Sequence, residues 1–364
     1  MFGTILISIT TFMHVYVFWR AASIPFIKEH VPLKILIGTG VVLWIIFFAG
    51  RIIGHDGTGY PAAILEFFGM NWMAALFLIF TALLLTDIVT CFGFIIPRFS
   101  PRLRGWALSI GITLSIIALV QGMRPPVVKE YEVFLPNLPD AMDKTVLVAL
   151  SDMHLGLQLG EHWLAARIAQ VEKLRPDIVV LLGDIFEGHG AFEDPLIAAF
   201  KKLNAPYGVW AVLGNHEFHG RGKTDLFEKA GFNLLRNKWA EIRPGFVLAG
   251  VDDLTSRRRR NLKGDPVSQA LKDRPFGASI LLSHTPWESE NAAKAGAGLM
   301  LCGHTHAGQI WPFNYLVQKQ YPLLTGRYEV DGMTVIVSRG TGTWGPRMRL
   351  WRAGEILCIT LRTR

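Results

Sequence analysis

The chain has 364 residues, too many for one ordinary small domain, and its hydrophobic residues, 51% of the total, are concentrated before residue 123. The net charge of +8 favours an anionic partner, but no RNP-type, zinc-finger or helix-turn-helix motif is apparent, so nucleic acid is not expected. Three widely spaced cysteines indicate neither a disulfide framework nor a thiolate metal site.

Four apolar segments before residue 123 are close to the length that a transmembrane helix needs, about 20 residues. They lie at Phe2–Phe18, Ile35–Gly50, Trp72–Ile96 and Trp106–Gln121. Tyrosine and tryptophan near several of their ends are typical of membrane interfaces. We therefore expect residues 1–122 to form an all-α membrane domain of four transmembrane helices.

Basic residues are unevenly distributed between these segments. The first and third connections hold three each, namely Arg20, Lys28, Lys34, Arg98, Arg102 and Arg104. The second connection holds only Arg51. By the positive-inside rule the first and third connections face the cytoplasm. We therefore expect an integral protein of the cell membrane, with both termini and the rest of the chain on the extracytoplasmic side.

Two ionisable residues, His14 and Asp87, fall within the apolar segments. Both lie at a similar distance from the cytoplasmic end of their helices, so they could pair across the bundle. Ionisable groups inside a membrane are costly, and a proton or ion relay is one interpretation. A structural hydrogen bond is the other.

Residues 123–144 carry prolines, mixed charge and a short alternating segment, which indicates a linker with an edge strand. Apolar β-rich runs then recur at Val146–Leu150, Ile178–Leu182, Val209–Leu213, Phe246–Val251, Ile280–Leu282, Leu299–Leu301, Thr334–Val337 and Ile356–Leu361. Helical patterns intervene at Trp163–Leu174 and Pro195–Leu203. We therefore expect residues 145–364 to form a layered α/β domain.

Metal-binding residue types follow five of these runs. They are Asp152 with His154, then Asp184, Asn215, His284, and His304 with His306. Taken singly, each is more often a turn residue, a helix cap or a satisfied polar group. Together they indicate a metal site, because ligands in α/β sheets collect at the carboxyl ends of strands.

The ordered pattern D-x-H, G-D, G-N-H-E, H and G-H-x-H resembles that of the calcineurin-like metallophosphoesterases, across Val146–Leu361. The SDMHLG, GHTHAGQ and SRGTGTWGPRMR segments and the four-helix leader are similar to the membrane-linked bacterial branch of that family, the YkuE-like and YaeI-like phosphohydrolases. The resemblance implies a four-layer α-β-β-α sandwich with a site for two metal ions.

The resemblance also implies how the ligands are divided. The first metal would be held by Asp152, His154 and His306, and the second by Asn215, His284 and His304. Asp184 would bridge the two. The expected metals are two divalent or trivalent ions, because imidazole and oxygen donors suit manganese, iron or zinc better than they suit calcium.

His216 resembles the non-ligand histidine of the family, which contacts the phosphate or protonates the leaving group. Many members have an aspartate that orients this histidine, and Glu187 stands at the corresponding position. We expect Glu187 to do the same with one more methylene. His162, His189 and His219 are expected at the surface or rim of the site.

Three features bear on the substrate. Arg257 and Arg258 belong to a run of four arginines, which is either a solvated basic loop or a contact for a phosphate or an anionic lipid headgroup. Trp311–Val317 is either a core-packed turn or a wall for an acyl chain. Arg347 is a candidate phosphate contact.

The sequence thus predicts a membrane-anchored hydrolase that cleaves a phosphoester or pyrophosphate bond with a metal-activated hydroxide, on a lipid-linked substrate at the membrane surface. One alternative is a hydrolase of soluble phosphomonoesters or nucleotides that is merely anchored. Another is a non-catalytic scaffold or a transporter with an accessory domain. Membrane lipids are the expected neighbours, and the sequence gives no indication of oligomeric state.

Overall fold

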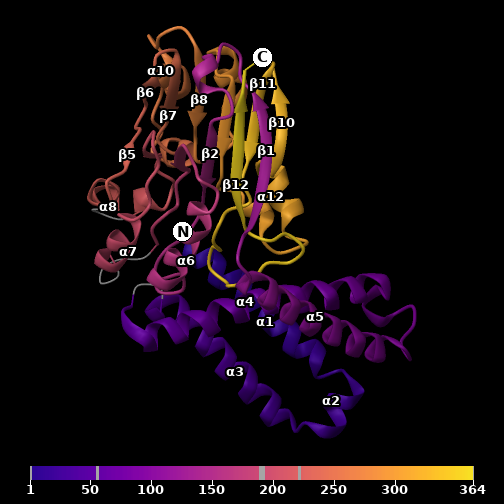
Figure 1. The fold of residues 1–364 in the computed structure, drawn as a ribbon. Helices are drawn as coiled ribbons and strands as arrows, with labels where there is room; N and C mark the ends of the chain where they lie inside the picture. The colour runs from indigo at the N-terminus through magenta and orange to yellow at the C-terminus, as the bar shows by residue number, and fades with distance from the viewer. Residues whose placement is uncertain (1, 55–56, 188–192, 220–222, 364) are drawn as a thin grey trace. The chain divides into compact units, whose positions relative to one another are not determined.

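The computed structural model describes residues 2–54, 57–187, 193–219 and 223–363 (Figure 1). The chain forms two compact units. The helical unit consists of Met1–Arg124 and Gly345–Trp351. The α/β unit consists of Pro125–Trp344 and Arg352–Arg364.

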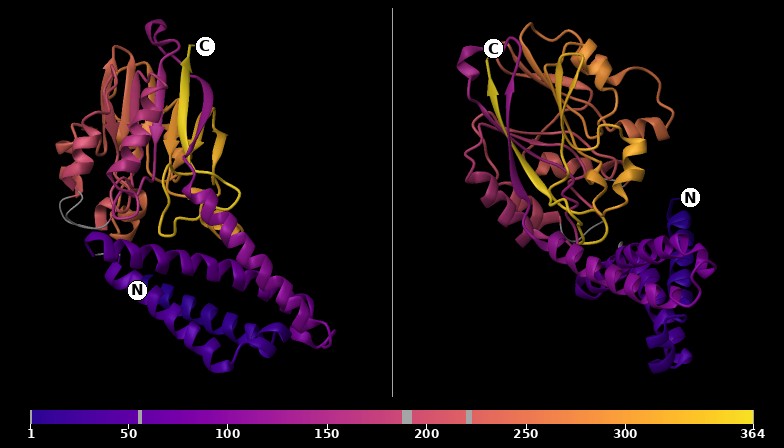
Figure 2. Two further views of the ribbon diagram at one scale, coloured as in Figure 1. Left: turned by 60° about the horizontal axis from the view of Figure 1, so that its bottom comes forward. Right: turned by 90° about the vertical axis from the view of Figure 1, so that its right-hand side faces the viewer.

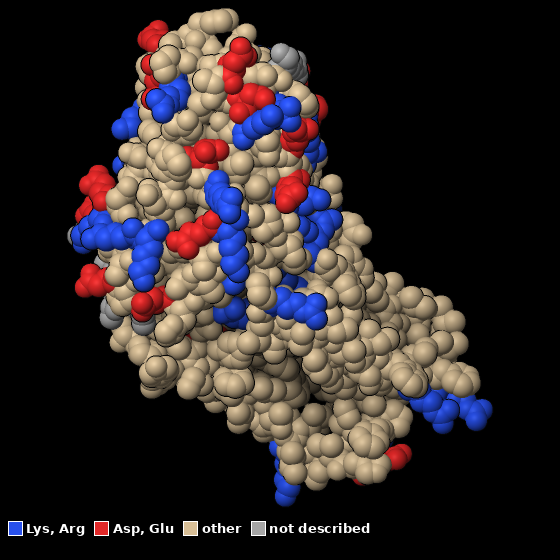
Figure 3. Space-filling model, viewed as in Figure 1, with Lys and Arg blue, Asp and Glu red and all other residues tan. Residues whose placement is uncertain are grey.

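The helical unit contains four long helices, α1 (Phe2–Ala21), α3 (Leu33–Ala49), α4 (Gly59–Val89) and α5 (Ser100–Met123). Shorter elements connect them: α2 (Pro25–His30), the π-helical η1 (Gly50–Gly54) and the 3₁₀-helical η2 (Cys91–Gly93). By length and composition, four helices could cross a membrane. Many large apolar side chains on them point outward, as lipid-facing side chains do. Figure 3 shows few charged side chains on the viewed face of this unit.

Helix α4 differs from the predicted segment, because it begins at Gly59 rather than Trp72 and ends at Val89 rather than Ile96. Pro61 lies in its first turn, where a missing backbone N–H costs no helical hydrogen bond. Glu66 is buried, so this charged residue does not face outward. Beyond the helix, Phe92 has a φ of 57°, which stops helical propagation.

The predicted pairing of His14 with Asp87 is wrong. His14 Nε2 lies 3.0 Å from the carbonyl oxygen of Gly40. The Asp87 carboxylate instead lies 2.5 Å from Arg20 Nε and 2.8 Å from Arg104 Nε, and it accepts a hydrogen bond from the Tyr16 hydroxyl. Arg20 and Arg104 are therefore not free loop charges, because both form buried ion pairs with Asp87. Lys28, Lys34, Arg98 and Arg102 keep the charge asymmetry between the connections.

The α/β unit contains two six-stranded sheets. The first has the order β1 (Val127–Phe134), β12 (Glu355–Arg362), β2 (Val146–Leu150), β3 (Ile178–Leu181), β4 (Val209–Ala211), β5 (Asn233–Leu234). The second has the order β10 (Gly326–Val330), β11 (Met333–Val337), β9 (Leu299–Cys302), β8 (Ala278–Leu282), β7 (Phe246–Gly250), β6 (Lys238–Arg243). The expected edge strand is β1, which pairs in parallel with β12.

The apolar residues of the strands explain the layers. One face of each sheet contributes to a shared core that includes Leu147, Val180, Leu248, Ile280 and Leu301. The outer face of the first sheet is covered by α6 (Glu161–Glu172), α7 (Glu193–Phe200) and α8 (Lys223–Lys229), and that of the second by α10 (Pro266–Leu271) and α11 (Ser289–Lys294). Two views show the sheets between these helices (Figure 2). The predicted α-β-β-α sandwich, preceded by a helical region, is confirmed.

The segment Gly345–Trp351 packs within the helical unit, which the sequence does not indicate. The Arg349 N–H donates to the carbonyl oxygen of Ala118 over 2.9 Å, and the Trp351 N–H donates to Gln121 Oε1 over 2.9 Å. A Cβ on Gly122 would lie 2.3 Å from the carbonyl oxygen of Arg347. The backbone of this segment therefore lies directly against the end of α5.

Candidate metal centre and active site

The candidate ligands lie where parallel strands of the two sheets end. Strands β2, β3 and β4 run parallel, and so do β8 and β9. Backbone hydrogen bonds continue past the strand ends, since the Asp152 N–H donates to Gly183 and the Gly303 N–H donates to His284. The loops that carry the polar side chains are therefore held together.

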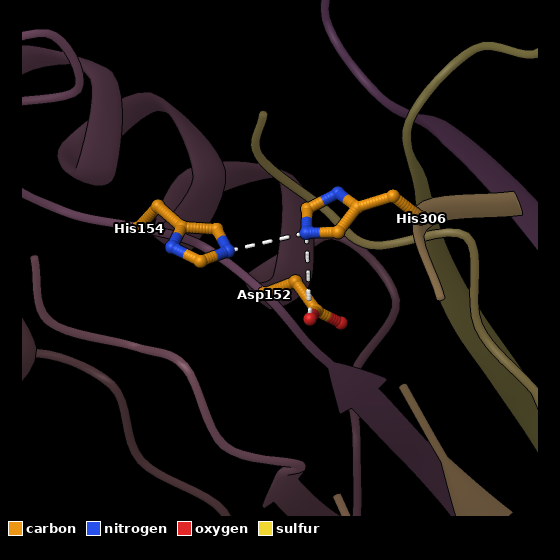
Figure 4. A group of neighbouring side chains, drawn as sticks. All are labelled: Asp152, His154 and His306. Atoms are coloured by element: carbon orange, nitrogen blue, oxygen red, sulfur yellow. Dashed lines mark hydrogen bonds and ion pairs between the residues drawn. The ribbon is translucent and has the colours of Figure 1, made fainter. Parts of the chain in front are cut away.

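One group consists of Asp152, His154 and His306, and its ligand atoms lie within 4.8 Å of one another (Figure 4). His154 Nε2 lies 3.1 Å from His306 Nε2, which is in turn 3.5 Å from Asp152 Oδ1. Figure 4 shows the two rings and the carboxylate pointing toward a common point. All three residues are buried.

Two further groups overlap at the Asp184 carboxylate. Asp184, His284 and His304 form one, and His154, Asp184 and His216 form the other. His284 Nε2 lies 3.2 Å from Asp184 Oδ2 and 3.1 Å from His304 Nδ1. His154 Nε2 lies 3.9 Å from the same carboxylate oxygen. Asp184 therefore stands between the His154 side and the His284 side of the site.

Hydrogen bonds fix which ring nitrogen of His284 and of His154 faces inward. His284 Nδ1 donates to the Leu182 carbonyl oxygen over 2.8 Å, which leaves Nε2 as the inward lone pair. His154 Nδ1 donates to Glu187 over 2.7 Å, with the same result. The nitrogen pairs at 3.1 Å thus require a proton or a metal cation between them.

Three observations fit this donor set to metal ions. Asn215 Oδ1 is buried, and among the described residues no donor reaches it. A buried acceptor without a donor is costly unless a cation or water satisfies it. Burial, together with the nearby His284, lowers the pKa of His304 to about 3, so the ring is neutral as a metal ligand must be.

The third observation is backbone strain. Five of the seven candidate ligands have a left-handed backbone, with φ between 47° and 71°: Asp152, His154, Asp184, His304 and His306. Residues other than glycine rarely adopt this backbone conformation, and those that do are often found at functional sites.

The glycines of the motifs permit the close approach of these loops. A Cβ on Gly303 would lie 1.8 Å from Ser151 Oγ, and one on Gly214 would lie 2.2 Å from Asp184 Oδ1. No side chain fits at either position. Glycine therefore precedes His304 and Asn215 for steric reasons.

Glu187 lies beside His216, as the sequence predicts, with its Oε1 3.0 Å from His216 Nδ1. It also holds His154, which the sequence does not indicate. Burial alone would raise the pKa of Glu187, but His216 and His154 hold it well below its usual range. Burial alone would lower the pKa of His216, but the carboxylates of Asp184 and Glu187 have a larger, opposite effect and raise this pKa to about 9.

Two residues of the site carry no predicted role. The buried Glu217 carboxylate accepts hydrogen bonds from four backbone N–H groups, those of Asp184, Ile185, Phe186 and Gly214. It thereby ties the loop after β3 to the loop after β4. In the sequence, the position of Glu217 at the end of the G-N-H-E motif is the feature that could have indicated this role.

Tyr321, at the end of helix α12 (Asn314–Gln320), is the second such residue. Its hydroxyl lies 2.7 Å from His304 Nε2, while His304 Nδ1 faces His284. Burial raises the pKa of Tyr321 to about 12, so it stays a neutral phenol. No motif marks this tyrosine in the sequence.

Three of the four arginines belong to a helix, whereas one of the two alternatives placed the whole run in a loop. Helix α9 (Leu254–Arg259) is capped by Asp253, and cationic side chains stabilise its carboxyl end through the helix dipole. Arg258 lies 5.4 Å from the ring centroid of Trp287, and Trp287 stacks on Tyr321 at 5.3 Å. Arg258 is therefore two aromatic rings away from His304.

The other two candidate substrate contacts, Arg257 and Arg347, lie in different units of the chain. Arg257 Nη2 donates to the Lys263 carbonyl oxygen over 3.3 Å. Arg347 belongs to the segment Gly345–Trp351 of the helical unit, and burial lowers its pKa. His189 lies outside the described residues.

A family model described as calcineurin-like phosphoesterase matches residues 145–308. A solved dimetal phosphatase from Danio rerio is similar, with a TM-score of 0.38 and 14% identity over 55% of this chain and 88% of that one. The Danio rerio "transmembrane protein with metallophosphoesterase domain" is 33% identical over 70% of this chain and 62% of its own length. An uncharacterized metallophosphoesterase of Campylobacter jejuni is 33% identical over 70% of this chain and 68% of its own length. This identity shows that the chain belongs to the calcineurin-like metallophosphoesterases, a family of metal-dependent phosphoester hydrolases.

Proposed function

We propose that this protein is a membrane-anchored dinuclear-metal phosphohydrolase that cleaves a phosphoester or pyrophosphate bond of a lipid-linked substrate at the membrane surface. The observation that carries the metal chemistry is the pair of ligand groups that meet at Asp184. The four membrane-length helices of the same chain support the anchoring and the lipid substrate.

In this proposal Asp152, His154 and His306 hold one metal, Asn215, His284 and His304 hold the other, and Asp184 serves both. Manganese, iron or zinc suits these nitrogen and oxygen donors. Two bound metal ions supply the charge that clamps a phosphoryl group and the lowered pKa of a bound water. The buried Asn215 Oδ1 and the 3.1 Å nitrogen pairs support this assignment.

His216 is proposed to hold a proton on Nε2 for the leaving oxygen. Its Nδ1 faces the Glu187 carboxylate, so Nε2 is the nitrogen directed toward Asp184, at 3.9 Å. Glu187 would orient the ring and stabilise its doubly protonated form, in which Nε2 carries this proton. A positioned general acid contributes about 10²- to 10⁴-fold to a rate.

Basic side chains are proposed to select the substrate. Arg257 and Arg258 on α9 would attract an anionic headgroup or a second phosphate, and Arg347 would contact a phosphate. Each basic residue near an anionic membrane contributes about 1 kcal/mol to attraction. The catalytic unit is proposed to lie on the extracytoplasmic side, on the evidence of the charge asymmetry of the connections.

Phosphate release from phosphatidic acid and from p-nitrophenyl phosphate, measured on the full chain in nanodiscs, tests this function. We expect both to be hydrolysed with added Mn²⁺, with the higher kcat/KM for the lipid. A preference for the soluble ester would support the merely anchored hydrolase of soluble phosphomonoesters or nucleotides. No hydrolysis of either ester would favour the scaffold.

A transporter with an accessory domain is less well supported. His14 and Asp87 belong to separate hydrogen-bonding groups, and Asp87 is paired with two arginines. A relay needs a chain of neighbouring ionisable groups, which these two residues do not form.

A further inference from the structure

Exposed apolar side chains of the α/β unit are concentrated beside the metal centre. In the described part of this unit, nine large apolar side chains are exposed, and five of them are Trp311, Phe313, Tyr315, Leu316 and Trp344. The first four lie within six consecutive residues that follow the two histidines of the GHTH motif. Tyr315 and Leu316 are 59% and 57% exposed. Clusters of this kind on soluble domains mark binding surfaces.

The segment is fixed relative to the candidate ligands at both of its ends. A Cβ on Gly308 would lie 2.3 Å from Asn314 Cα, so the first residue of α12 touches the turn that follows His306. At the other end of α12, Tyr321 lies 2.7 Å from His304 Nε2. Helix α12 therefore holds Tyr315 and Leu316 at a defined place next to the metal centre.

Positive charge lies at the same end of α12 as Tyr321. Trp287 stacks on Tyr321, and Arg258 lies over Trp287, with Arg259 beside it on α9. Lys319 is exposed one helical turn after Tyr315. Apolar side chains flanked by basic ones match an amphiphile with an anionic head.

We propose that Trp311, Phe313, Tyr315 and Leu316 bind the hydrocarbon chain of an amphiphilic phosphate whose headgroup reaches the metal centre and α9. This inference rests on the proposed function and specifies how a lipid-linked substrate is recognised. The occupant is the chain of one substrate molecule, because the surface begins at the ligand loop itself and basic groups suit the charged head beside it.

Alkylphosphonates of increasing chain length test this surface directly, since their C–P bond is not a phosphoester. The full chain, loaded with Mn²⁺ in nanodiscs, is titrated calorimetrically with ethylphosphonate and with octylphosphonate, with empty nanodiscs as the blank. Each fully buried methylene strengthens binding about fourfold. We therefore expect octylphosphonate to bind at least about tenfold more tightly, even if most of its chain stays in contact with solvent.

The variant Tyr315→Ser/Leu316→Ser should lose most of this chain-length dependence and should bind ethylphosphonate within about twofold of the wild type. Phe276→Ser is the matched control, because Phe276 is 86% exposed and precedes β8, whereas His284 follows that strand. It should behave as the wild type. Equal affinity of the wild type for both phosphonates, or equal losses for both in the double variant, would overturn the proposal.

Hydrolysis of p-nitrophenyl phosphate is measured on the same samples and reports on the proposed function separately. Its absence, together with intact chain-length dependence, would refute the hydrolase while leaving the hydrocarbon surface supported. Its presence without chain-length dependence would refute the surface alone.

Discussion

The helical unit and the α/β unit both bury carboxylates next to basic groups, but they neutralise them differently. In the helical unit Asp87 lies within 2.8 Å of two guanidinium groups and is bonded to a tyrosine hydroxyl. In the α/β unit, candidate ligand atoms face each other across the site, and five of the candidate ligands have a left-handed backbone. Among the described residues, no hydrogen-bond donor reaches Asn215 Oδ1. A buried charge that is internally paired needs no further ligand, whereas buried ligand atoms that converge on one point are prepared for one.

Replacing Asp184 with asparagine tests this contrast most severely. The change removes the one carboxylate that both ligand groups share, so we expect hydrolysis to fall below detection. Loss of a residue that only orients a metal ligand already costs about 10- to 100-fold in metal affinity. Turnover of p-nitrophenyl phosphate and the Mn²⁺ content of the purified variant measure the effect. Activity within tenfold of the wild type would argue against a shared ligand.

Replacing His216 with alanine should separate catalysis from metal binding. We expect kcat to fall by about 10²- to 10⁴-fold, because the proton for the leaving oxygen is lost. Metal content should remain as in the wild type, since Asn215 rather than His216 is proposed as the ligand from this loop. Loss of metal together with activity would show that His216 is itself a ligand.

Replacing Tyr321 with phenylalanine should weaken metal binding without removing a ligand. The hydroxyl group holds His304 Nε2 at 2.7 Å and so presents Nδ1 to the metal. We expect the affinity for one metal ion to fall by about 10- to 100-fold. Competition with a chelator measures this affinity, and Tyr315→Phe, within helix α12, is the control. Unchanged affinity would mean that the contact has no effect on the ligand.

Replacing Asp87 with asparagine makes the same chemical change as at Asp184, but in the helical unit. It leaves Arg20 and Arg104 without their buried counter-charge, which costs about 3–5 kcal/mol of stability. We expect a lower melting temperature in detergent and an unchanged kcat per folded molecule. Lys28→Gln, outside the ion-pair cluster, should alter neither quantity. Loss of turnover without loss of stability would assign Asp87 a role in the reaction.

The parts of this structure that follow from the sequence are those with local signals. Apolar runs mark the strands, glycine followed by a ligand marks the loops, and β2 has the predicted bounds, Val146–Leu150. The site is also predicted in outline, because the carboxyl ends of parallel strands must meet.

The contacts that the sequence does not reveal are long-range and lack periodicity. Tyr321 reaches His304 across 17 residues, and Glu217 acts through backbone N–H groups that no residue type encodes. Asp87 finds its arginines on two other helices. The early start of α4 was missed because Glu66 looks unsuited to a membrane until its burial is known.

We propose that two metal ions share Asp184, with His306 bound to one and His304 to the other. The most direct test is the metal-to-protein ratio of the full chain, His304→Ala and His306→Ala after Mn²⁺ loading, measured by inductively coupled plasma mass spectrometry. We expect about two ions in the wild type and about one in each variant. A single ion in the wild type, or none in both variants, would contradict it.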